Sequence, residues 1–258
     1  MVARNLHLIL LAGGQGLRAA DSDSVPKQFR PVVGGLLFTV SLLEFMTLDS
    51  SSGFRPSNLI LTVPDTWRET AGQALQNLER DLERDLDIPW ALASAGSSRT
   101  ASTWNAVREL EARYSPEADD LVAVHDAARP FASADLLLRL GRAAAESGGA
   151  VPGVPVSDTI VQSKAGVQSK AGVQPDAGAA VYLDRSSLVG VQTPQVFRWD
   201  LFHAAHAWAA EAGAVFTDDG GLLAERGQAP VVVAGEQGNW KVTTNGDWLR
   251  AETLLNSD

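Results

Sequence analysis

Short apolar runs, each bounded by glycine, proline or polar residues, recur along the chain. They are rich in valine, leucine and isoleucine and lack the strict alternation of apolar and polar residues that marks a half-buried strand. Runs of this kind are typical of strands that are buried on both faces of a parallel sheet. The pattern therefore predicts strands at residues 7–13, 58–64, 89–96, 120–127, 149–156 and 230–236.

Longer segments with helix-like spacing of apolar residues separate several of these runs. They cover residues 66–86, 97–114 and 133–147. Strands that alternate with helices favour an α/β fold with a doubly wound, mostly parallel, Rossmann-like sheet. A chain of 258 residues suits one large domain, so we expect a single domain over residues 1–258.

One segment interrupts this alternation. Residues 163–168 read SKAGVQ and are followed at once by an identical copy at residues 169–174. The stretches on either side, residues 156–162 and 179–186, both have strand-like composition. Two strands around a polar, glycine-containing connection predict a β-hairpin that projects from the main body. We expect this hairpin to span residues 156–185.

Composition narrows the functional classes. Apolar residues make up 45% and charged residues 20% of the chain, as in ordinary globular proteins. No apolar run approaches the ~20 residues that span a bilayer, and the absence of cysteine excludes disulfides, so we expect a cytoplasmic protein with no membrane partner. The net charge of −10 argues against a nucleic-acid partner, which usually meets a basic face. On such an acidic chain, local groups of Arg and Lys are informative.

The first predicted strand runs into a glycine loop. Gly13, Gly14 and Gly16 follow it, and the cations Arg18 and Lys27 come next. Glycines allow a backbone to approach a ligand closely, and the two cations indicate that this ligand is anionic. Because ligands of α/β folds bind at the carboxyl ends of the strands, we expect cations that follow other predicted strands or the hairpin to converge on the same phosphates. These cations are Arg99, Arg129, Arg185 and Lys241.

Two other functions have weaker support. The spacing of Gly14, Gly16 and Ala19 fits the dinucleotide-binding fingerprint of NAD(P)-binding oxidoreductases. That fingerprint requires an immediate helix and an acidic residue about 20 positions later, whereas the next predicted strand here begins only at residue 58. His203 and His206 could bind a metal from one helix face, but no third ligand stands near them, which favours an ordinary surface helix.

Several short motifs, in order along nearly the whole chain, carry a resemblance to a known family. They are AGGQGLR, PKQF, RTAS, HDAARPF, PVSDTI, LDRSSL, QTPQVF, TDD and NWKVTT. The chain resembles the 2-C-methyl-D-erythritol 4-phosphate cytidylyltransferases of isoprenoid precursor synthesis. The ribitol-5-phosphate cytidylyltransferases share most of these motifs and stay open as an alternative. The run His125-Asp126-Ala127-Ala128-Arg129 favours methylerythritol phosphate.

The resemblance implies a reaction between two anionic partners. The phosphate of methylerythritol phosphate would attack the α-phosphorus of CTP and release pyrophosphate, in an enzyme that depends on Mg²⁺. A phosphate monoester is largely dianionic at neutral pH, so the nucleophile needs no general base and catalysis should rest on cations. The catalytic cations implied are Arg18, Lys27 and Lys241, and Asp126 would bind Mg²⁺.

The resemblance also implies which residues bind the two substrates. For CTP they are small residues that allow close backbone approach: Ala12, Gly13, Gly14, Gly16, Gly96, Ser97 and Ser102. For the sugar phosphate they are Arg129, Thr159, Arg185 and Thr193, and Asp126 is a substrate-binding residue through its Mg²⁺.

A homodimer is a further implication of the resemblance. In the family the hairpin, here residues 156–185, packs against its equivalent in a second subunit with two-fold symmetry. Thr159 and Arg185 of one chain would then complete the sugar-phosphate site of the other. Three features depart from the family pattern: a longer gap between Arg18 and Lys27, Ser97 in place of an acidic residue, and Gly220-Gly221 after the motif TDD.

The tandem copy generates a first prediction. Deleting residues 169–174 should leave cytidylyl transfer within a few-fold of the full chain, because shortening a loop by six residues changes its closure entropy by well under ~1 kcal/mol. Steady-state rates of the two proteins test this. A large loss of activity in the shortened protein would mean that the second copy supports the site.

Overall fold

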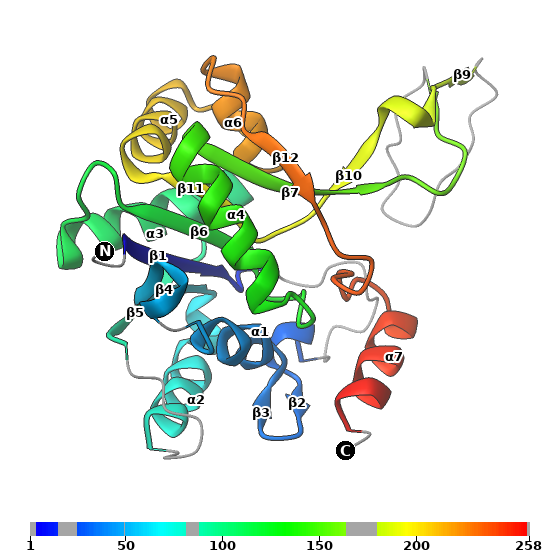
Figure 1. Cartoon of the computed structure of the whole chain (residues 1–258). Helices are drawn as coiled ribbons and strands as arrows, with labels where there is room; N and C mark the ends of the chain where they lie inside the picture. Colours follow the sequence, from blue (N-terminus) through cyan, green and yellow to red (C-terminus); the bar gives the residue numbers. More distant parts are fainter. Residues whose placement is uncertain (1–3, 15–24, 49, 81–87, 164–179, 257–258) are drawn as a thin grey trace.

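A central sheet of eight strands organises the molecule (Figure 1). The computed structural model describes residues 4–14, 25–48, 50–80, 88–163 and 180–256. Seven strands follow the spatial order β10-β7-β11-β6-β1-β4-β5, and β12 pairs with β7. Their bounds are β1 (Arg4–Leu11), β4 (Phe54–Val63), β5 (Trp90–Ser94), β6 (Leu121–Asp126), β7 (Gly149–Pro155), β10 (Val189–Val191), β11 (Gln195–Arg198) and β12 (Val231–Ala234).

Parallel pairing dominates this sheet. β6, β1, β4 and β5 pair in parallel along one half, and β12 runs parallel to β7. β10 and β11 run in the opposite direction, β10 against β7 and β11 between β6 and β7. The doubly wound, mostly parallel sheet predicted from the sequence is therefore confirmed. Each of the six predicted strands falls on a strand of this sheet.

Helices cover both faces of the sheet (Figure 1). Their bounds are α1 (Leu37–Met46), α2 (Arg68–Arg80), α3 (Arg99–Tyr114), α4 (Ala134–Ser147), α5 (Trp199–Ala212), α6 (Asp219–Glu225) and α7 (Asn245–Leu255). The three predicted helices correspond to α2, α3 and α4, although residues 81–87 lie outside the described part. Within the described residues, no helix has the length and apolar character needed to cross a membrane.

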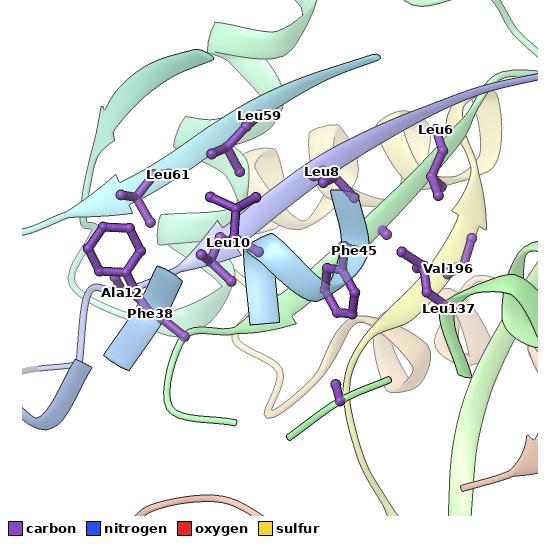
Figure 2. Packing of buried hydrophobic residues seen from close by; sticks show 14 of the residues in the cluster. Leu6, Leu8, Leu10, Ala12, Phe38, Phe45, Leu59, Leu61, Leu137 and Val196 are labelled. Atoms are coloured by element: carbon purple, nitrogen blue, oxygen red, sulfur yellow. The ribbon is translucent and has the colours of Figure 1, made fainter. Parts of the chain in front are cut away.

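Strand β1 shows how the two faces are filled. Leu8 and Leu10 belong to a cluster that includes Phe38 of α1 and Leu137 of α4 (Figure 2). Ile9, between them, belongs to a second cluster with residues of α3, α5 and α6. Successive side chains of a strand point to opposite faces, and both faces of β1 are covered. This is why the run reads as continuously apolar in the sequence.

The predicted hairpin region contains two short strands. β8 (Val161–Ser163) and β9 (Ala180–Tyr182) pair antiparallel as a separate small sheet, which lies away from the main sheet in Figure 1. Val161 and Val181 are each more than 40% exposed. Residues 164–179, which include all of the repeated segment except Ser163, lie outside the described residues. The use of this segment as a dimerisation arm stays a prediction.

Candidate active site

A cleft of about 430 Å³ lies at the carboxyl ends of β1, β5 and β6. A cavity of this size is typical of a small-ligand site, and the position is where open α/β sheets bind ligands. The residues that line it are Leu11, Gly13, Gly14, Gln28, Gly96, Ser97, Ser98, Arg99, Ser102, Asp126, Ala128 and Lys241.

The first wall of the cleft is the loop after β1. The side-chain amide of Gln28 donates to the carbonyl oxygens of Ala12 and Gly14, at 2.8 Å each. A Cβ at position 13 would lie 2.7 Å from the Cβ of Ala95, so only glycine allows this approach to the loop after β5. At Gly14 a Cβ would meet nothing within 4 Å. The side chain of Gln28 therefore fixes the backbone of this loop, and the loop leaves free space at Gly14.

The second wall is the loop between β5 and α3. Ser98 caps α3 and accepts from the amide of Ala101. The hydroxyl of Ser102 accepts from the amide of Gly96 at 3.0 Å and donates to the carbonyl of Ser98 at 2.8 Å. A Cβ at Gly96 would lie 2.6 Å from that of Ala101. The wall is thus a tight backbone turn that suits a flat ligand.

Asp126, the last residue of β6, is the centre of charge in the cleft. The ammonium of Lys241 lies 2.8 Å from its Oδ2, and Nε atoms of Arg99 and Arg129 lie 3.8 Å from its carboxylate oxygens. Burial by itself would raise the pKa of Asp126, but Lys241, Arg99 and Arg129 outweigh it and hold that pKa at about 2. The carboxylate is therefore ionised at neutral pH.

A buried relay fixes the backbone of Asp126. Its amide donates to the hydroxyl of Thr193 at 3.0 Å, and that hydroxyl lies 3.1 Å from Nδ1 of His125. Nε2 of His125 lies 2.9 Å from the carbonyl oxygen of Arg129. A carbonyl only accepts, so Nε2 carries the proton and Thr193 donates to Nδ1. Thr193 was predicted to bind the sugar phosphate. Its hydroxyl instead donates to His125 and accepts from the amide of Asp126.

The segment that carries Lys241 is held in the same way. Gln192 donates to the carbonyl oxygens of Glu236 and Asn239, and the buried side chain of Asn239 donates to the carbonyl of Thr193 at 2.8 Å. The ammonium of Lys27 donates to the carbonyl of Thr243. Lys27 therefore binds the segment that carries Lys241.

The structure brings together most of the predicted site. Eight predicted residues line the cleft: Gly13, Gly14, Gly96, Ser97, Arg99, Ser102, Asp126 and Lys241. Ala12, Arg129 and Thr193 contact residues that line it. Lys27 contacts Thr243, two residues after Lys241. Thr159 and Arg185 are exposed outside the cleft lining, and Arg185 donates to the carbonyl of Ser157 at 2.5 Å. Gly16 and Arg18 lie outside the described residues.

Two findings go beyond the sequence-based expectations. Gln28 was not predicted as a site residue, although it stands in the motif PKQF. The surface-helix interpretation is wrong for His206, which is 1% exposed and lies 3.1 Å from Asp219. His203 is partly exposed and contacts Glu111 at 3.3 Å.

The described residues offer no ready-made metal centre. No group of three or more potential His, Cys, Asp or Glu ligands occurs among them. Among the described residues that line the cleft, Asp126 is the one carboxylate. An ionised single carboxylate does fit Mg²⁺, which usually takes one or two protein carboxylates together with substrate phosphates and water.

Comparisons with known proteins agree on one family. The family model described as 2-C-methyl-D-erythritol 4-phosphate cytidylyltransferase matches residues 6–257. The chain is 34% identical to the 2-C-methyl-D-erythritol 4-phosphate cytidylyltransferase of Geobacillus thermodenitrificans, covering 98% of each chain. It is 33% identical to the bifunctional enzyme IspD/IspF of Rhodopseudomonas palustris, covering 98% of this chain but 56% of that protein. The chain thus spans little more than half of such bifunctional relatives.

Solved structures share the fold. The crystal structure of 2-C-methyl-D-erythritol 4-phosphate cytidylyltransferase from Thermus thermophilus superposes with a TM-score of 0.66 at 26% identity, covering 98% of each chain. That of 4-diphosphocytidyl-2C-methyl-D-erythritol synthase from Anaerococcus prevotii gives a TM-score of 0.73 at 21% identity, covering 98% of this chain and 96% of that one.

The buried relay predicts a pH effect on stability. Burial lowers the pKa of His125 from 6.5 to about 4, so the unfolded chain takes up a proton first as the pH falls. The free energy of unfolding should therefore decrease between pH 6.5 and 4, by up to roughly 3 kcal/mol from this group. The carboxylate of Asp126 loses its stabilising contribution only when the pH falls below 3.8, which is its ordinary pKa.

Urea titrations across this pH window measure the effect. His125→Gln should show a shallower decrease than the unaltered protein, whatever its stability at neutral pH. His203→Gln is the matched control and should keep the steep decrease, because His125 is retained. Equal slopes for all three proteins would contradict the role given to His125.

Proposed function

The chain belongs to the 2-C-methyl-D-erythritol 4-phosphate cytidylyltransferase family, and on that premise we propose that its cleft joins CTP to 2-C-methyl-D-erythritol 4-phosphate with release of pyrophosphate. It is a cytidylyltransferase of the non-mevalonate route to isoprenoid precursors. The observation that carries the proposal is the grouping of Arg99, Arg129 and Lys241 around Asp126 beside a glycine-lined cleft.

The cations would do the catalytic work. A bond forms between a phosphate oxygen of the sugar substrate and the α-phosphorus of CTP, and the bond from that phosphorus to pyrophosphate breaks. Negative charge is concentrated when these polyanions meet, so preorganised cations lower the barrier. Lys241, 44% exposed and adjacent to Asp126, can reach the transferred phosphate. Lys27 and Arg18 are assigned to the triphosphate.

Asp126 is the candidate ligand for Mg²⁺. Its low pKa keeps it ionised, and Lys241, Arg99 and Arg129 lie within 4 Å of its carboxylate. A bound Mg²⁺ would supply positive charge that screens the triphosphate. Asp126 therefore has two functions here: it holds Lys241 in the cleft and supplies an oxygen ligand.

The two loop walls are assigned to the nucleotide. The backbone of Ala12, Gly13 and Gly14 on one side and of Gly96 and Ser97 on the other can approach a flat base closely. Gln28 and Ser102 keep these loops in place. Cytosine would then be recognised chiefly by backbone amide and carbonyl groups, with Gly16 as a further contact in the first loop.

The decisive experiment is a substrate comparison. Pyrophosphate release is measured with CTP and either methylerythritol phosphate or ribitol 5-phosphate, and then with UTP, ATP and GTP. Rapid release with CTP and methylerythritol phosphate is expected. Preference for ribitol 5-phosphate would move the chain to the related activity, and equal use of ATP or GTP would overturn the nucleotide assignment.

Loss of one cation should slow the reaction sharply. Lys241→Ala should reduce kcat about 10²–10³-fold, because a preorganised charge next to the reacting phosphate is lost. Thermal unfolding should change little, since Lys241 is 44% exposed. Arg108→Ala, which removes an exposed cation from α3, is the control and should retain full activity. A Lys241→Ala protein with normal kcat would refute this assignment.

The proposed functional unit is a two-fold homodimer. The exposed apolar side chains of the small sheet support it, because a two-stranded hairpin is marginal alone in water. Val161, Val181, Tyr182 and Leu183 are all at least 37% exposed in the single chain. Thr159 and Arg185 would complete the partner's sugar-phosphate site beside Arg129.

Mixing two inactive variants tests shared sites. Lys27→Ala and Arg185→Ala should each be nearly inactive alone. In a mixed dimer, one site has lost both residues and the other has lost neither. Random reassembly of equal amounts should restore about a quarter of full activity, since half of the dimers are mixed and each has one intact site. Mixed dimers without activity would mean that each site is built from one chain.

A further inference from the structure

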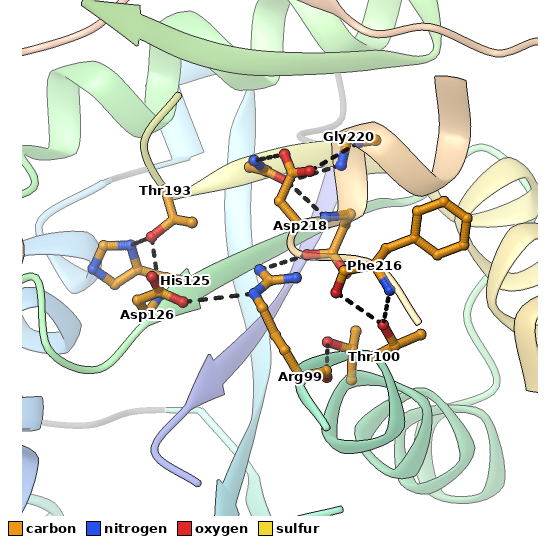
Figure 3. A network of polar contacts seen from close by, with 12 residues as sticks. Arg99, Thr100, His125, Asp126, Thr193, Phe216, Asp218 and Gly220 are labelled. Atoms are coloured by element: carbon orange, nitrogen blue, oxygen red, sulfur yellow. Dashed lines mark hydrogen bonds and ion pairs between the residues drawn. The ribbon is translucent and has the colours of Figure 1, made fainter. Parts of the chain in front are cut away.

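Arg99 stands between two carboxylates of different environments. Its guanidinium lies 2.7 Å from Oδ2 of Asp219, whereas its Nε is 3.8 Å from Oδ1 of Asp126. Figure 3 shows this side chain reaching from the start of α3 between the end of β6 and the start of α6. The side chain of Asp219 is 1% exposed, and that of Arg99 is 21% exposed and lines the cleft. The ion pair with Asp219 therefore holds the buried end of the Arg99 side chain in place.

A second buried side chain holds Asp219. Nε2 of His206, on α5, lies 3.1 Å from Oδ1 of Asp219, and both side chains are 1% exposed. Burial would raise the pKa of Asp219, but Arg99 and His206 outweigh it and keep that pKa well below its ordinary value. The two carboxylate oxygens thus have one partner each, and Oδ2 is directed to Arg99.

The start of α6 is fixed by its neighbours. Gln195, 1% exposed, accepts from the amides of Asp219 and Gly220 and donates to Asp218. The hydroxyl of Thr100 donates to the carbonyl of Phe216 and accepts from its amide, at 3.1 and 2.9 Å (Figure 3). These contacts tie α3 to the segment before α6, so the distance between Arg99 and Asp219 is set by backbone as well as by charge.

We propose that Asp219, held by His206, is a positioning residue that keeps Arg99 available to the phosphates of CTP and prevents it from closing onto Asp126. The proposal rests on the proposed function. In the described part of the chain, the carboxylates within 4 Å of Arg99 are those of Asp219 and Asp126, and Asp219 is the one on its buried side. Without the Asp219 charge, the nearest carboxylate is Asp126, and an arginine pairs readily with a carboxylate through two parallel hydrogen bonds.

A direct pair between Arg99 and Asp126 would change the charges at the centre of the cleft. Arg99 would compete with Lys241 for the Asp126 oxygens and would present fewer donors to a phosphate. The buried pair of Arg99 and Asp219 is a weak contributor to stability as such, because desolvation offsets its attraction. The role proposed for this pair is to orient Arg99, one of the cations of the site.

A double-mutant cycle tests the proposal. Asp219→Asn should lower kcat/KM for CTP about 10- to 100-fold, and CTP affinity measured by calorimetry without the second substrate should fall in parallel. In an Arg99→Ala background, adding Asp219→Asn should change both quantities less than about twofold, because Asp219 acts through Arg99. The same addition should raise the thermal stability of Arg99→Ala, since it neutralises a buried carboxylate that has lost its cation.

Two matched variants separate positioning from folding. Asp218→Asn removes the neighbouring charge but keeps a good N-cap for α6, and it should keep kcat/KM within about threefold. His206→Gln, whose amide can still donate to Asp219, should be closer to the unaltered protein than His206→Leu. Equal losses from Asp219→Asn in both backgrounds would overturn the proposal and assign Asp219 a structural role.

Measurements of CTP affinity and of pyrophosphate release also separate this proposal from the proposed function. A chain that binds CTP but releases no pyrophosphate would refute the function, while the cycle in CTP affinity would still decide the role of Asp219. A chain that binds no CTP would overturn both.

Discussion

The carboxylate of Asp126 is the charge on which the arrangement of the site depends. Burying an ionised group is costly unless it is paired and hydrogen-bonded, and here three cations meet that requirement. They come from the first turn of α3, from the loop after β6 and from the segment before α7. One largely buried negative charge therefore brings the start of α3 and the segment before α7 to the end of β6.

Neutral polar groups hold this charge in place. Thr193 and His125 fix the amide of Asp126, and Gln192 and Asn239 fix the segment that carries Lys241. Most of these side chains are buried, so their hydrogen bonds are shielded from water and rigid. Preorganisation of this kind is what a charge-stabilised phosphoryl transfer requires, because groups that are already oriented need not reorganise during the reaction.

Positive charge exceeds negative charge at the mouth of the cleft. Arg99, Arg129 and Lys241 face Asp126 on a chain whose net charge is −10. A group of cations on an acidic chain concentrates the attraction for polyanions in one place. Because Arg99 also pairs with Asp219, three cations face two carboxylates here, and the remaining positive charge favours an anionic ligand.

The sequence by itself determined the parallel core of the sheet, because strands buried on both faces have continuous apolar runs. The glycine loop after the first strand and the cations Arg99 and Arg129 were expected to converge, since the carboxyl ends of parallel strands share one edge of the sheet. The roles of Asp126 and Lys241 came from the motifs shared with the family. The antiparallel strand β11 was not predicted. Its short sequence includes the buried Gln195 and lacks a continuous apolar pattern.

Only the tertiary structure decided that Thr193 supports Asp126, that Gln28 fastens the glycine loop and that His206 reaches Arg99 through Asp219. Each of these is a hydrogen bond or ion pair between side chains or backbone brought together by packing, and local sequence patterns carry no information about such partners.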